Sequence, residues 1–487
     1  GPNPTIQLGG VAVARQGTGA VVYVRQDAGA DHVFVSRLAD GAFQAPERLD
    51  AGLSAAASQP VIAAMDDGRL AVAFVSGGAV VAVVKPAGDQ PWTGPQVLAA
   101  AGSSPAVAAS VNRGAYVAFT TPGGGGADVR LARLDRRSAA FTVYDGPLDV
   151  DPNAAAGDGA GRPSVGIAAD NSAVVAWGEG GHVYARRAFA DHLSQYSQDA
   201  GVGDAPEVAL EDDSGLGWAM FRSGATVVAR RLRGATFDGP VVLGPGEAVG
   251  APRLALAPRG VGYAAVGGAA TNGAFASVLV QDAFRPFAAL GGGFAAGPAP
   301  VPAVDDDGDG VVAFQQGDAA GGRAIGARRF PHPSGGASVP APGRAVTLSR
   351  PELGPPDAAL GLDAASDRLG DTAIAWVQAD ASGRRLVAGA FDRAPGAFAG
   401  TTTTAWRRDR RVLAWSESRE LWGPLTYVVS VDRRAVGQVA GRTRIRLARP
   451  LRRGEHRWRV AAVDRRGQVT RTRARTLRIG PAPRKGR

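Results

Sequence analysis

The clearest chemical motif in this sequence of 487 residues is an acidic turn between two short apolar segments. Asp305, Asp307 and Asp309 alternate along the chain and a glycine follows them. Alternate carboxylates in a tight loop suit calcium, which takes six to eight oxygen ligands. The later ligands of known calcium loops are missing, because Ala313 stands at the ninth position and Gln316 at the twelfth. We therefore weigh a calcium site, the only cofactor that the sequence suggests, against a polar turn without metal.

A second candidate site consists of aromatic and polar residues at the ends of apolar segments. Trp177, Glu179 and His182 lie within six residues of one another, and Arg222 follows the corresponding segment further along the chain. An aromatic ring beside a carboxylate, an imidazole and a guanidinium can bind a sugar or a peptide through stacking and hydrogen bonds. We predict that these four residues contact a ligand. The alternative is that they are solvated loop residues.

The residue types that catalysis needs are sparse. The chain has no cysteine, which excludes disulfides, thiolate metal sites and cysteine nucleophiles. Its five histidines lack the spacing of metal ligands, and neither a Gly-x-Ser-x-Gly nucleophile turn nor a phosphate-binding loop is present. We assign no catalytic residue and favour a protein that is not an enzyme. The alternative is a secreted polysaccharide hydrolase or lyase; hydrolysis by paired carboxylates would need two facing acids.

Basic residues are concentrated at the C-terminal end. Residues 405–487 contain 23 Arg and one Lys against six acidic residues, a net charge of +18 that leaves −8 for the rest of the chain. Such a surface attracts anionic partners. We expect contacts with an anionic surface from the clustered residues Arg407, Arg408, Arg410, Arg411, Arg452 and Arg453. The other interpretation is coding bias, since all but two of the 54 basic residues are arginine.

A repeated unit of about fifty residues must position these side chains. Each unit has a short apolar strand, a turn with Asp or Gly, a second strand, a third strand that often ends in Arg, and a closing segment. The second strands end at Tyr23, Phe74, Phe119, Trp177, Met220, Ala265, Phe314 and Trp376. Four short strands per unit without helical periodicity are typical of a β-propeller, whose blades bury their faces against one another. We predict an all-β chain with an eight-bladed β-propeller over residues 3–393.

Two features concern the ring that such a propeller forms. Glu207 and Arg253 take equivalent places on consecutive first strands, and we expect them to form an ion pair in the central channel. Residues 4–8 repeat the phrase that closes the other units, whereas the eighth unit lacks a fourth strand. We predict that this N-terminal segment supplies the outer strand of the last blade and thereby closes the ring, which removes an exposed edge.

Residues 396–480 follow a different pattern. Segments 427–431 and 456–462 alternate apolar and polar residues, as in a two-sheet sandwich. Their order and spacing resemble a fibronectin type III domain, with Trp415 in the place of the family's core tryptophan. His456 stands where the family has a tyrosine that makes a corner hydrogen bond. The resemblance implies a β-sandwich used for display and weak binding, without catalysis. We expect residues 481–487 to be disordered.

These features together predict an extracellular binding or adhesion module, secreted or held at a cell surface. The chain has no run of 18 apolar residues, so we predict no transmembrane segment. No motif that reads RNA or DNA accompanies the arginines. We expect a monomer that recognises a cell-surface polysaccharide or protein through the propeller loops between second and third strands, with the basic domain aiding attachment to an anionic surface.

Overall fold

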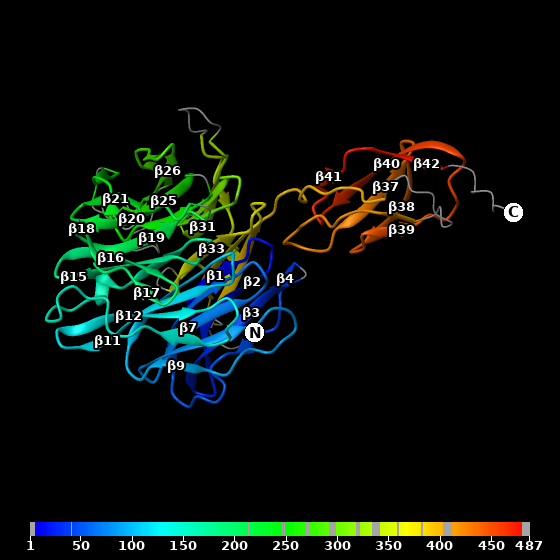
Figure 1. The fold of residues 1–487 in the computed structure, drawn as a ribbon. Coiled ribbons are helices and arrows are strands. Elements are labelled where there is room, and N and C mark those ends of the chain that lie inside the picture. Colours follow the sequence, from blue (N-terminus) through cyan, green and yellow to red (C-terminus); the bar gives the residue numbers. More distant parts are fainter. Residues whose placement is uncertain are drawn as a thin grey trace. The chain divides into compact units, whose positions relative to one another are not determined.

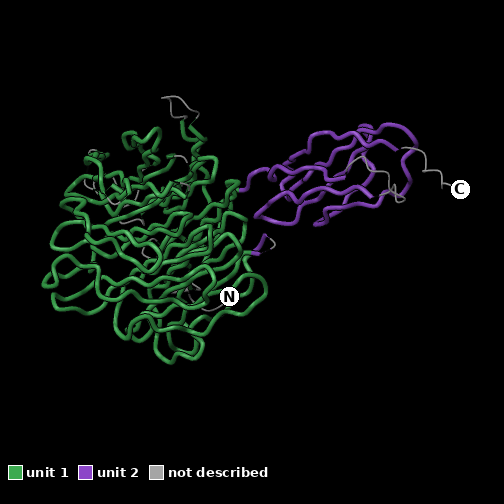
Figure 2. Tube along the Cα trace, in the orientation of Figure 1, with its two compact units in different colours: residues 1–38, 43–391 green, residues 39–42, 392–487 purple. Residues whose placement is uncertain are grey.

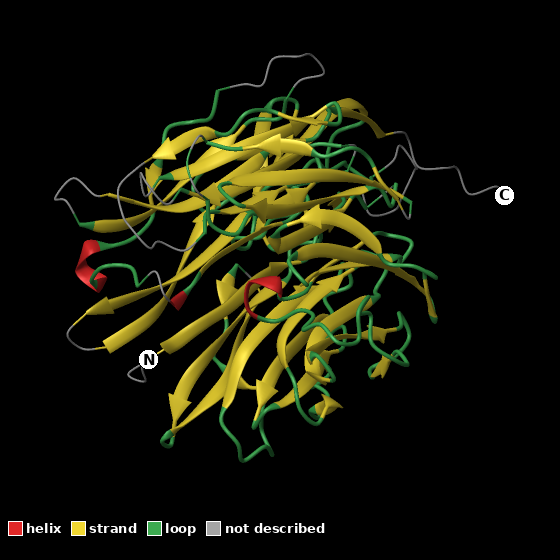
Figure 3. Cartoon of the chain, turned by 90° about the vertical axis from the view of Figure 1, so that its left-hand side faces the viewer, coloured by secondary structure: helices red, strands yellow, loops and turns green. Residues whose placement is uncertain are grey.

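The computed structural model divides into two compact units (Figure 2): unit 1 is residues 1–38 and 43–391, and unit 2 is residues 39–42 and 392–487. Regular structure in the described residues is β-strand, apart from two short 3-10 turns at Gly159–Gly161 and Pro351–Leu353 (Figure 3). Within those residues no helix has the length and apolarity needed to cross a membrane. The structure describes residues 5–39, 41–212, 214–234, 236–245, 247, 249–258, 260–268, 273–291, 299–317, 322–333, 341–357, 360–380, 383–402 and 412–479.

Unit 1 is built from short antiparallel sheets that follow one another along the chain. Sheets 1 and 2 contain β1 (Thr5–Val13), β2 (Gly19–Asp27), β3 (Ala30–Ala39), β4 (Ala42–Phe43) and β5 (Glu47–Arg48), then β6 (Ala57–Ala64), β7 (Leu70–Ser76), β8 (Ala79–Lys85) and β9 (Gln96–Ala99). Sheets 3 and 4 contain β10 (Ser103–Ala109), β11 (Ala115–Gly123), β12 (Gly126–Leu134) and β13 (Phe141–Val143), then β14 (Ser164–Ile167), β15 (Ala173–Glu179), β16 (His182–Phe189), β17 (His192–Leu193) and β18 (Gln198–Val202).

The remaining sheets of unit 1 have the same organisation. Sheets 5 and 6 contain β19 (Asp204–Leu210), β20 (Gly217–Ser223), β21 (Thr226–Arg233), β22 (Thr236–Phe237) and β23 (Val241–Leu243), then β24 (Arg253–Leu256), β25 (Gly262–Gly267), β26 (Ala274–Val280), β27 (Ala283–Phe284) and β28 (Ala288–Gly291). Sheets 7 and 8 contain β29 (Val301–Val304), β30 (Gly310–Gly317), β31 (Arg323–Phe330) and β32 (Val346–Thr347), then β33 (Leu362–Ser366), β34 (Thr372–Asp380) and β35 (Gly383–Phe391).

The first strands of these sheets contact one another in a closed cycle. Each contacts the first strand of the following sheet, from β1 and β6 through β10, β14, β19, β24 and β29 to β33, and β33 contacts β1. Figure 1 shows β1, at the blue end of the chain, close to β33. Sheets arranged in this way around a common axis form a β-propeller.

The turn between the first and second strands follows one pattern in every sheet, with one extra residue in sheet 5. The N–H of its first residue donates to the C=O of the residue that closes the turn, at 2.6–3.0 Å. The residue just before the closing one is in the left-handed region, with φ of 64–87°. Six of these eight residues are glycine, which reaches this region without strain. An aspartate often caps the turn, as where Asp305 Oδ1 accepts from the Asp309 N–H at 2.8 Å. These contacts explain the Asp and Gly of the sequence repeat. The turns begin at Ala14, Met65, Ser110, Ala168, Glu211, Ala257, Asp305 and Asp367.

Small side chains allow the first strands to approach closely. Two residues before each turn, the eight equivalent positions hold only alanine or glycine: Ala12, Ala63, Ala108, Gly166, Ala209, Ala255, Ala303 and Ala365. A Cβ atom on Gly166 would lie 3.1 Å from the carbonyl oxygen of Val208 and 3.2 Å from Cα of Ala209 in the next sheet. Larger side chains would therefore push neighbouring sheets apart.

Apolar side chains fill the space between consecutive sheets. One core joins residues of sheets 2 and 3, another those of sheets 3 and 4, and further cores follow along the ring. The eight residues predicted to end the second strands all lie within β2, β7, β11, β15, β20, β25, β30 and β34. None of the eight is more than 4% exposed, so they are part of these cores.

The prediction for the N-terminal segment is wrong. Thr5–Val13 forms the single strand β1, which pairs with β2 inside sheet 1, while sheet 8 has three strands in the described chain. In most sheets a loop separates the closing segment from the next first strand, although only Gly203 separates β18 from β19. Here the predicted closing segment is followed directly by Gly9 and Gly10. These glycines lie at a register shift within β1. The predicted closing segment and the first strand therefore form one continuous strand.

Sheets 8 and 1 are instead joined by packing and by a hydrogen bond. The Val11 N–H donates to Asp363 Oδ2 of β33 at 2.7 Å. The same geometry recurs between sheets 4 and 5, where the Val208 N–H donates to Ser164 Oγ at 3.1 Å. The Val11 N–H of β1 is thus bonded by a side chain of the last sheet.

A network of charges links the turns at one end of the axis. The guanidinium of Arg15 donates to both carboxylate oxygens of Asp306, at 2.9 and 2.5 Å, and to Asp212 Oδ2 at 3.1 Å. The Arg15 N–H donates to Asp66 Oδ1 at 3.0 Å, and Arg368 lies 3.5 Å from Asp306. Burial alone would lower the pKa of Arg15, but the bond to Asp306 and the nearby negative charges raise it. Turns of five sheets therefore meet at one arginine.

We expect Arg15→Ala to destabilise unit 1 by about 2 kcal/mol, because it leaves half-buried carboxylates without their partner. The matched control is Arg113→Ala, which removes one exposed ion pair with Asp67 from the equivalent turn of sheet 3 and should cost less than about 1 kcal/mol. Chemical denaturation measures both. Equal losses in the two variants would contradict a special role for Arg15.

Unit 2 has two sheets around one core. β36 (Val412–Ala414) pairs with β39 (Arg444–Arg446), and the second sheet contains β38 (Arg434–Ala440), β37 (Thr426–Val431), β40 (Gly454–Val463), β41 (Val469–Arg471) and β42 (Arg475–Ile479). Trp415, next to β36, and Trp458 of β40 are 3% and 1% exposed and share a core with residues of both sheets. The predicted core position of Trp415 is confirmed.

His456 bonds to the chain through both ring nitrogens. Its Nε2 lies 2.8 Å from the carbonyl oxygen of Arg452, four residues earlier, and its Nδ1 lies 2.7 Å from Asp432 Oδ2. Both partners are hydrogen-bond acceptors, so both ring nitrogens must carry a proton to satisfy them. The bond with Asp432 accordingly raises the pKa of His456 and lowers that of Asp432.

We expect the imidazole of His456 to titrate above its usual pKa of 6.5. Because the folded-state pKa is raised, the stability that it contributes is fully present below pH 6.5 and disappears as the pH rises through the folded-state value. NMR titration of the histidine signals measures this pKa, and His456→Tyr identifies the signal. The tyrosine hydroxyl can still donate to the carbonyl of Arg452. A pKa at or below 6.5 would contradict the proton arrangement described.

Candidate functional site

Polar and charged side chains occupy equivalent positions on four first strands of unit 1. Ser164, Glu207, Arg253 and Asp363 hold equivalent positions, four residues before the turns of sheets 4, 5, 6 and 8. Ser164 Oγ lies 3.5 Å from Glu207 Oε2. Glu207, Arg253 and Asp363 are intermediate in exposure, and protein atoms surround both carboxylates.

Arg253 balances the two enclosed carboxylates. Burial raises the pKa of Glu207, while the charges of Arg253 and Arg162 oppose this increase. Burial also raises the pKa of Asp363, opposed by the Val11 N–H and by Arg253. The predicted ion pair is not formed, because no ion-pair or hydrogen-bond contact joins Glu207 and Arg253, both of which are described. Arg253 affects Glu207 only through its charge, and it affects Asp363 in the same way.

Two of the predicted ligand-binding residues bond to the chain itself. The indole N–H of Trp177 donates to Glu179 Oε2 at 2.8 Å. The Val150 and Asp151 N–H groups also donate to the Glu179 carboxylate, at 3.1 and 2.5 Å. Glu179 is only 4% exposed, so it holds the loop that leads into sheet 4.

The same arrangement in sheet 8 shows that this pairing is structural. Trp376 Nε1 donates to Gln378 Oε1 at 3.1 Å, and the Gln378 amide donates to the Arg350 and Gly354 carbonyls at 2.9 and 2.5 Å. The signal in the sequence was a tryptophan followed two residues later by Glu or Gln at equivalent positions of two repeats.

His182 keeps a partly exposed side chain, as does Arg222. Its imidazole is 39% exposed, stacks on Tyr184 with ring centroids 6.1 Å apart, and lies 3.0 Å from Asp199 Oδ2. Tyr184 in turn contacts the ring of Trp177. Arg222 is bound elsewhere, because its guanidinium donates to both oxygens of Asp204 at 2.7 and 2.6 Å.

Tyr184 and Asp199 neighbour His182 and were not among the residues predicted from the sequence. Tyr184 follows His182 by two residues on β16 and is therefore on the same face, which period-two alternation could have indicated. Asp199 lies opposite Tyr184 on β18. Its position depends on strand pairing, which local sequence does not reveal.

Asp149 is a further carboxyl whose pKa is raised. Burial raises the pKa of Asp149 to about 7, against the opposing hydrogen bond from the Val129 N–H, and the neighbouring Asp128 raises it further. Asp149 Oδ1 accepts that N–H at 2.8 Å. Glu179 is close enough to add to the effect.

The three aspartates of the acidic turn have different surroundings. Asp305 is buried and caps its own turn. Asp309 accepts from Arg329 at 2.9 Å and from the His332 N–H at 2.5 Å. Asp307 is exposed. Three carboxylates that converge within 4.8 Å are not found at this turn, all of whose residues are described.

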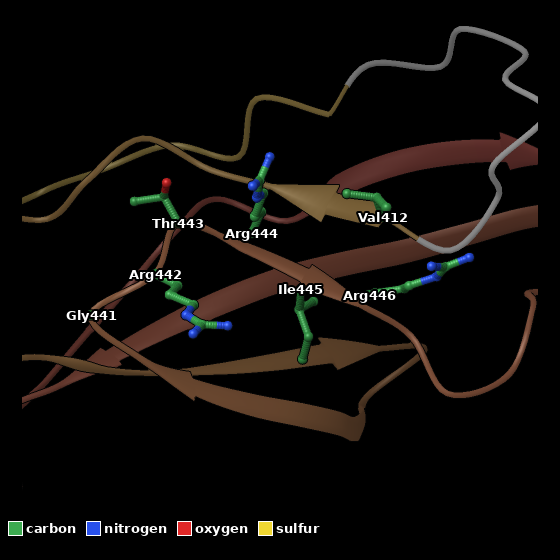
Figure 4. A pocket seen from close by; sticks show the side chains of 7 residues that line it. All are labelled: Val412, Gly441, Arg442, Thr443, Arg444, Ile445 and Arg446. Atoms are coloured by element: carbon green, nitrogen blue, oxygen red, sulfur yellow. The ribbon is translucent and has the colours of Figure 1, made fainter.

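The predicted basic contacts are only partly within the described structure. Arg407, Arg408, Arg410 and Arg411 lie outside the described residues. Arg452 and Arg453 are exposed just before β40. A pocket of about 550 Å³ lies at β39 (Figure 4) and is lined by Val412, Gly441, Arg442, Thr443, Arg444, Ile445 and Arg446.

We expect the melting temperature of unit 1 to be the same in calcium and in EDTA, because Asp305 and Asp309 already bond to groups of the chain. Asp309→Ala should lower it in both buffers, since Arg329 and the His332 N–H lose their acceptor. Differential scanning calorimetry provides the comparison. A rise in calcium that Asp307→Ala abolishes would instead support a metal site.

No protein-family model matches the chain, and no curated protein matches its sequence. Solved structures with similar shape include the NanB sialidase of Streptococcus pneumoniae, with TM-score 0.40, 7% identity, and coverage of 76% of this chain and 82% of that one. The Aleuria aurantia lectin has TM-score 0.37 and 9% identity over 59% of this chain and 96% of its own. Hsv2 of Kluyveromyces lactis has TM-score 0.42 and 10% identity over 70% and 99%.

Proposed function

We propose that this chain is an extracellular, non-catalytic binding protein that attaches to a polyanionic surface through unit 2. In this proposal unit 1 is an eight-bladed propeller and unit 2 a fibronectin type III-like sandwich. The closed cycle of first strands supports the blade number. The two sheets around one core and the hydrogen bond of His456 with the Arg452 carbonyl support the sandwich.

The observation that carries the function is a row of arginines on the outer face of the larger sheet of unit 2. Trp458 and Val460 of β40 point into the core, so the alternate residues Arg457 and Arg459 point outward and are exposed. Arg471 lies opposite Ala461 on β41 and is exposed on the same face.

Like charges on one face favour an anionic partner. Successive outward residues of a strand are roughly 7 Å apart, within the screening length of about 8 Å at physiological ionic strength. Residues 412–479 contain 17 Arg against five acidic residues, so within this part of the chain intramolecular pairing cannot neutralise the excess. A polymer with repeated carboxylate, sulfate or phosphate groups would relieve this repulsion.

The propeller offers a separate surface for a carbohydrate or protein partner. His182, Tyr184 and Asp199 combine aromatic rings with a carboxylate on β16 and β18. Such a combination suits stacking against a sugar ring or an aromatic side chain. This binding should depend less on salt than attachment through the arginines of unit 2, because stacking on aromatic rings is not screened by ions.

Polysaccharide cleavage is the second candidate, favoured by a specific observation. Glu207 and Asp363 are enclosed carboxyl groups with raised pKa values, and Asp149 titrates near 7. Raised values of this kind occur in general acids. Release of new reducing ends from a bound polysaccharide would support cleavage over binding.

The test measures binding of the full chain to immobilised alginate, a polymer of uronic acids, at low and high salt. The triple variant Arg457→Gln, Arg459→Gln, Arg471→Gln should lose about 3 kcal/mol, or roughly 100-fold in affinity, at about 1 kcal/mol per basic residue. High salt should remove the difference between variant and wild type.

A control with the same change in net charge separates this surface from general attraction. Arg113, Arg136 and Arg137 are exposed on unit 1, and their triple change to Gln should leave affinity within about twofold. Equal losses in the two triple variants would contradict attachment through unit 2.

A further inference from the structure

β39 lies at an edge of its sheet in unit 2. It pairs with β36 through Arg446 and Val412, Ile445 and Leu413, and Arg444 and Ala414. Among the described residues no strand pairs with its other side. Unpaired backbone groups on such an edge can bind a further strand.

The hydrogen-bond alternation shows which groups this edge presents. The Trp415 N–H donates to the Thr443 carbonyl at 2.9 Å, so Thr443 bonds toward β36. In an antiparallel pair bonding alternates from one residue to the next, so the N–H and C=O of Arg444 point to the open edge. The Ala414 groups confirm the alternation, because its carbonyl accepts from the Thr401 N–H on the far side of β36 at 2.8 Å.

Basic side chains surround this backbone position. Arg442 and Arg444 are exposed, and both line the pocket of about 550 Å³. Figure 4 shows Arg444 on one side of β39, and Arg442 with Ile445 on the other. The edge thus combines one free pair of backbone hydrogen-bonding groups with positive charge on both faces.

We propose that the open edge of β39 binds an extended acidic peptide as an added β-strand. The peptide residue opposite Arg444 exchanges two backbone hydrogen bonds with it and places an acidic side chain beside its guanidinium. The next peptide residue points to the other face, toward Ile445 and Arg442, where an apolar or acidic side chain can be accommodated. Specificity comes from the alternation of side chains and affinity from backbone bonds together with charge.

Charge also explains why this edge would select such a partner over a second copy of this chain. Charged residues on edge strands usually prevent edge-to-edge association. Here the charges share one sign, so they repel an identical edge and attract one of opposite sign. This site is separate from the arginine row of β40 and β41 and adds a protein partner to the proposed attachment surface.

The probe is a fluorescent seven-residue peptide that alternates glutamate and valine, and the readout is fluorescence anisotropy with the full chain. Two further peptides carry N-methyl groups on the glutamate amides or on the valine amides. Antiparallel pairing predicts that methylation of the glutamate amides weakens binding at least tenfold, because these amides face Arg444. Methylation of the valine amides should have little effect, because they point away.

Protein variants test the same contact from the other side. Arg444→Gln should weaken peptide binding about tenfold, whereas Arg434→Gln, at an exposed position on β38, should not. The triple variant of Arg457, Arg459 and Arg471 should still bind the peptide, so failure of the two proposals can be distinguished.

One result would overturn this inference. Equal binding of the two methylated peptides would show attraction by charge without strand addition. Displacement of the peptide by alginate, together with equal binding of the methylated peptides, would assign the edge to a polysaccharide. Loss of alginate binding alone would leave the peptide site standing and contradict the attachment surface.

Discussion

The close approach of the first strands around one axis is the constraint on which unit 1 depends. The positions two residues before each turn must be small for the strands to approach, and they are alanine or glycine in all eight strands. The packing of larger residues such as Val208 and Leu210 against the preceding sheet depends on this spacing. The turn geometry repeats because each first strand must reverse into a second strand at the same distance from the axis.

Closing the ring is a separate problem from building each sheet. The first and last sheets are far apart in sequence, so bringing them together costs chain entropy that local contacts do not offset. Two sets of polar contacts act at this point: the bond from Val11 to Asp363 and the charges that converge on Arg15. Both involve partly enclosed carboxylates, whose cost of burial is offset by donors from other sheets. Negative charges in unit 1 are therefore balanced by groups from other sheets. Arg253, for example, opposes the rise in pKa of both Glu207 and Asp363.

Polar residues near the loops have two roles that only their contacts separate. Glu179 and Gln378 receive hydrogen bonds from indole and backbone groups and hold entry loops in place. His182 retains solvent contact and neighbours Tyr184 and Asp199. Unit 2 differs, because its arginines outnumber its acidic residues. Residues 412–479 contain 17 Arg and five acidic residues. Charged groups on the first strands of unit 1 are thus enclosed and compensated by opposite charges. On unit 2, positively charged groups are exposed and in excess.

The sequence alone determined the all-β class, the repeat, the Asp and Gly turns, and eight buried residues of the second strands, although each of these strands continues two to four residues beyond its predicted end. Each of these depends on local periodicity or on backbone conformation, which neighbouring residues control. It also indicated the core position of Trp415. Only the tertiary structure decided that Thr5–Val13 is the first strand of sheet 1, that Glu179 holds a loop, that Asp309 bonds to Arg329, and that Asp199 lies beside His182. These facts depend on which strands pair and which side chains meet, and a local pattern is compatible with more than one such partner.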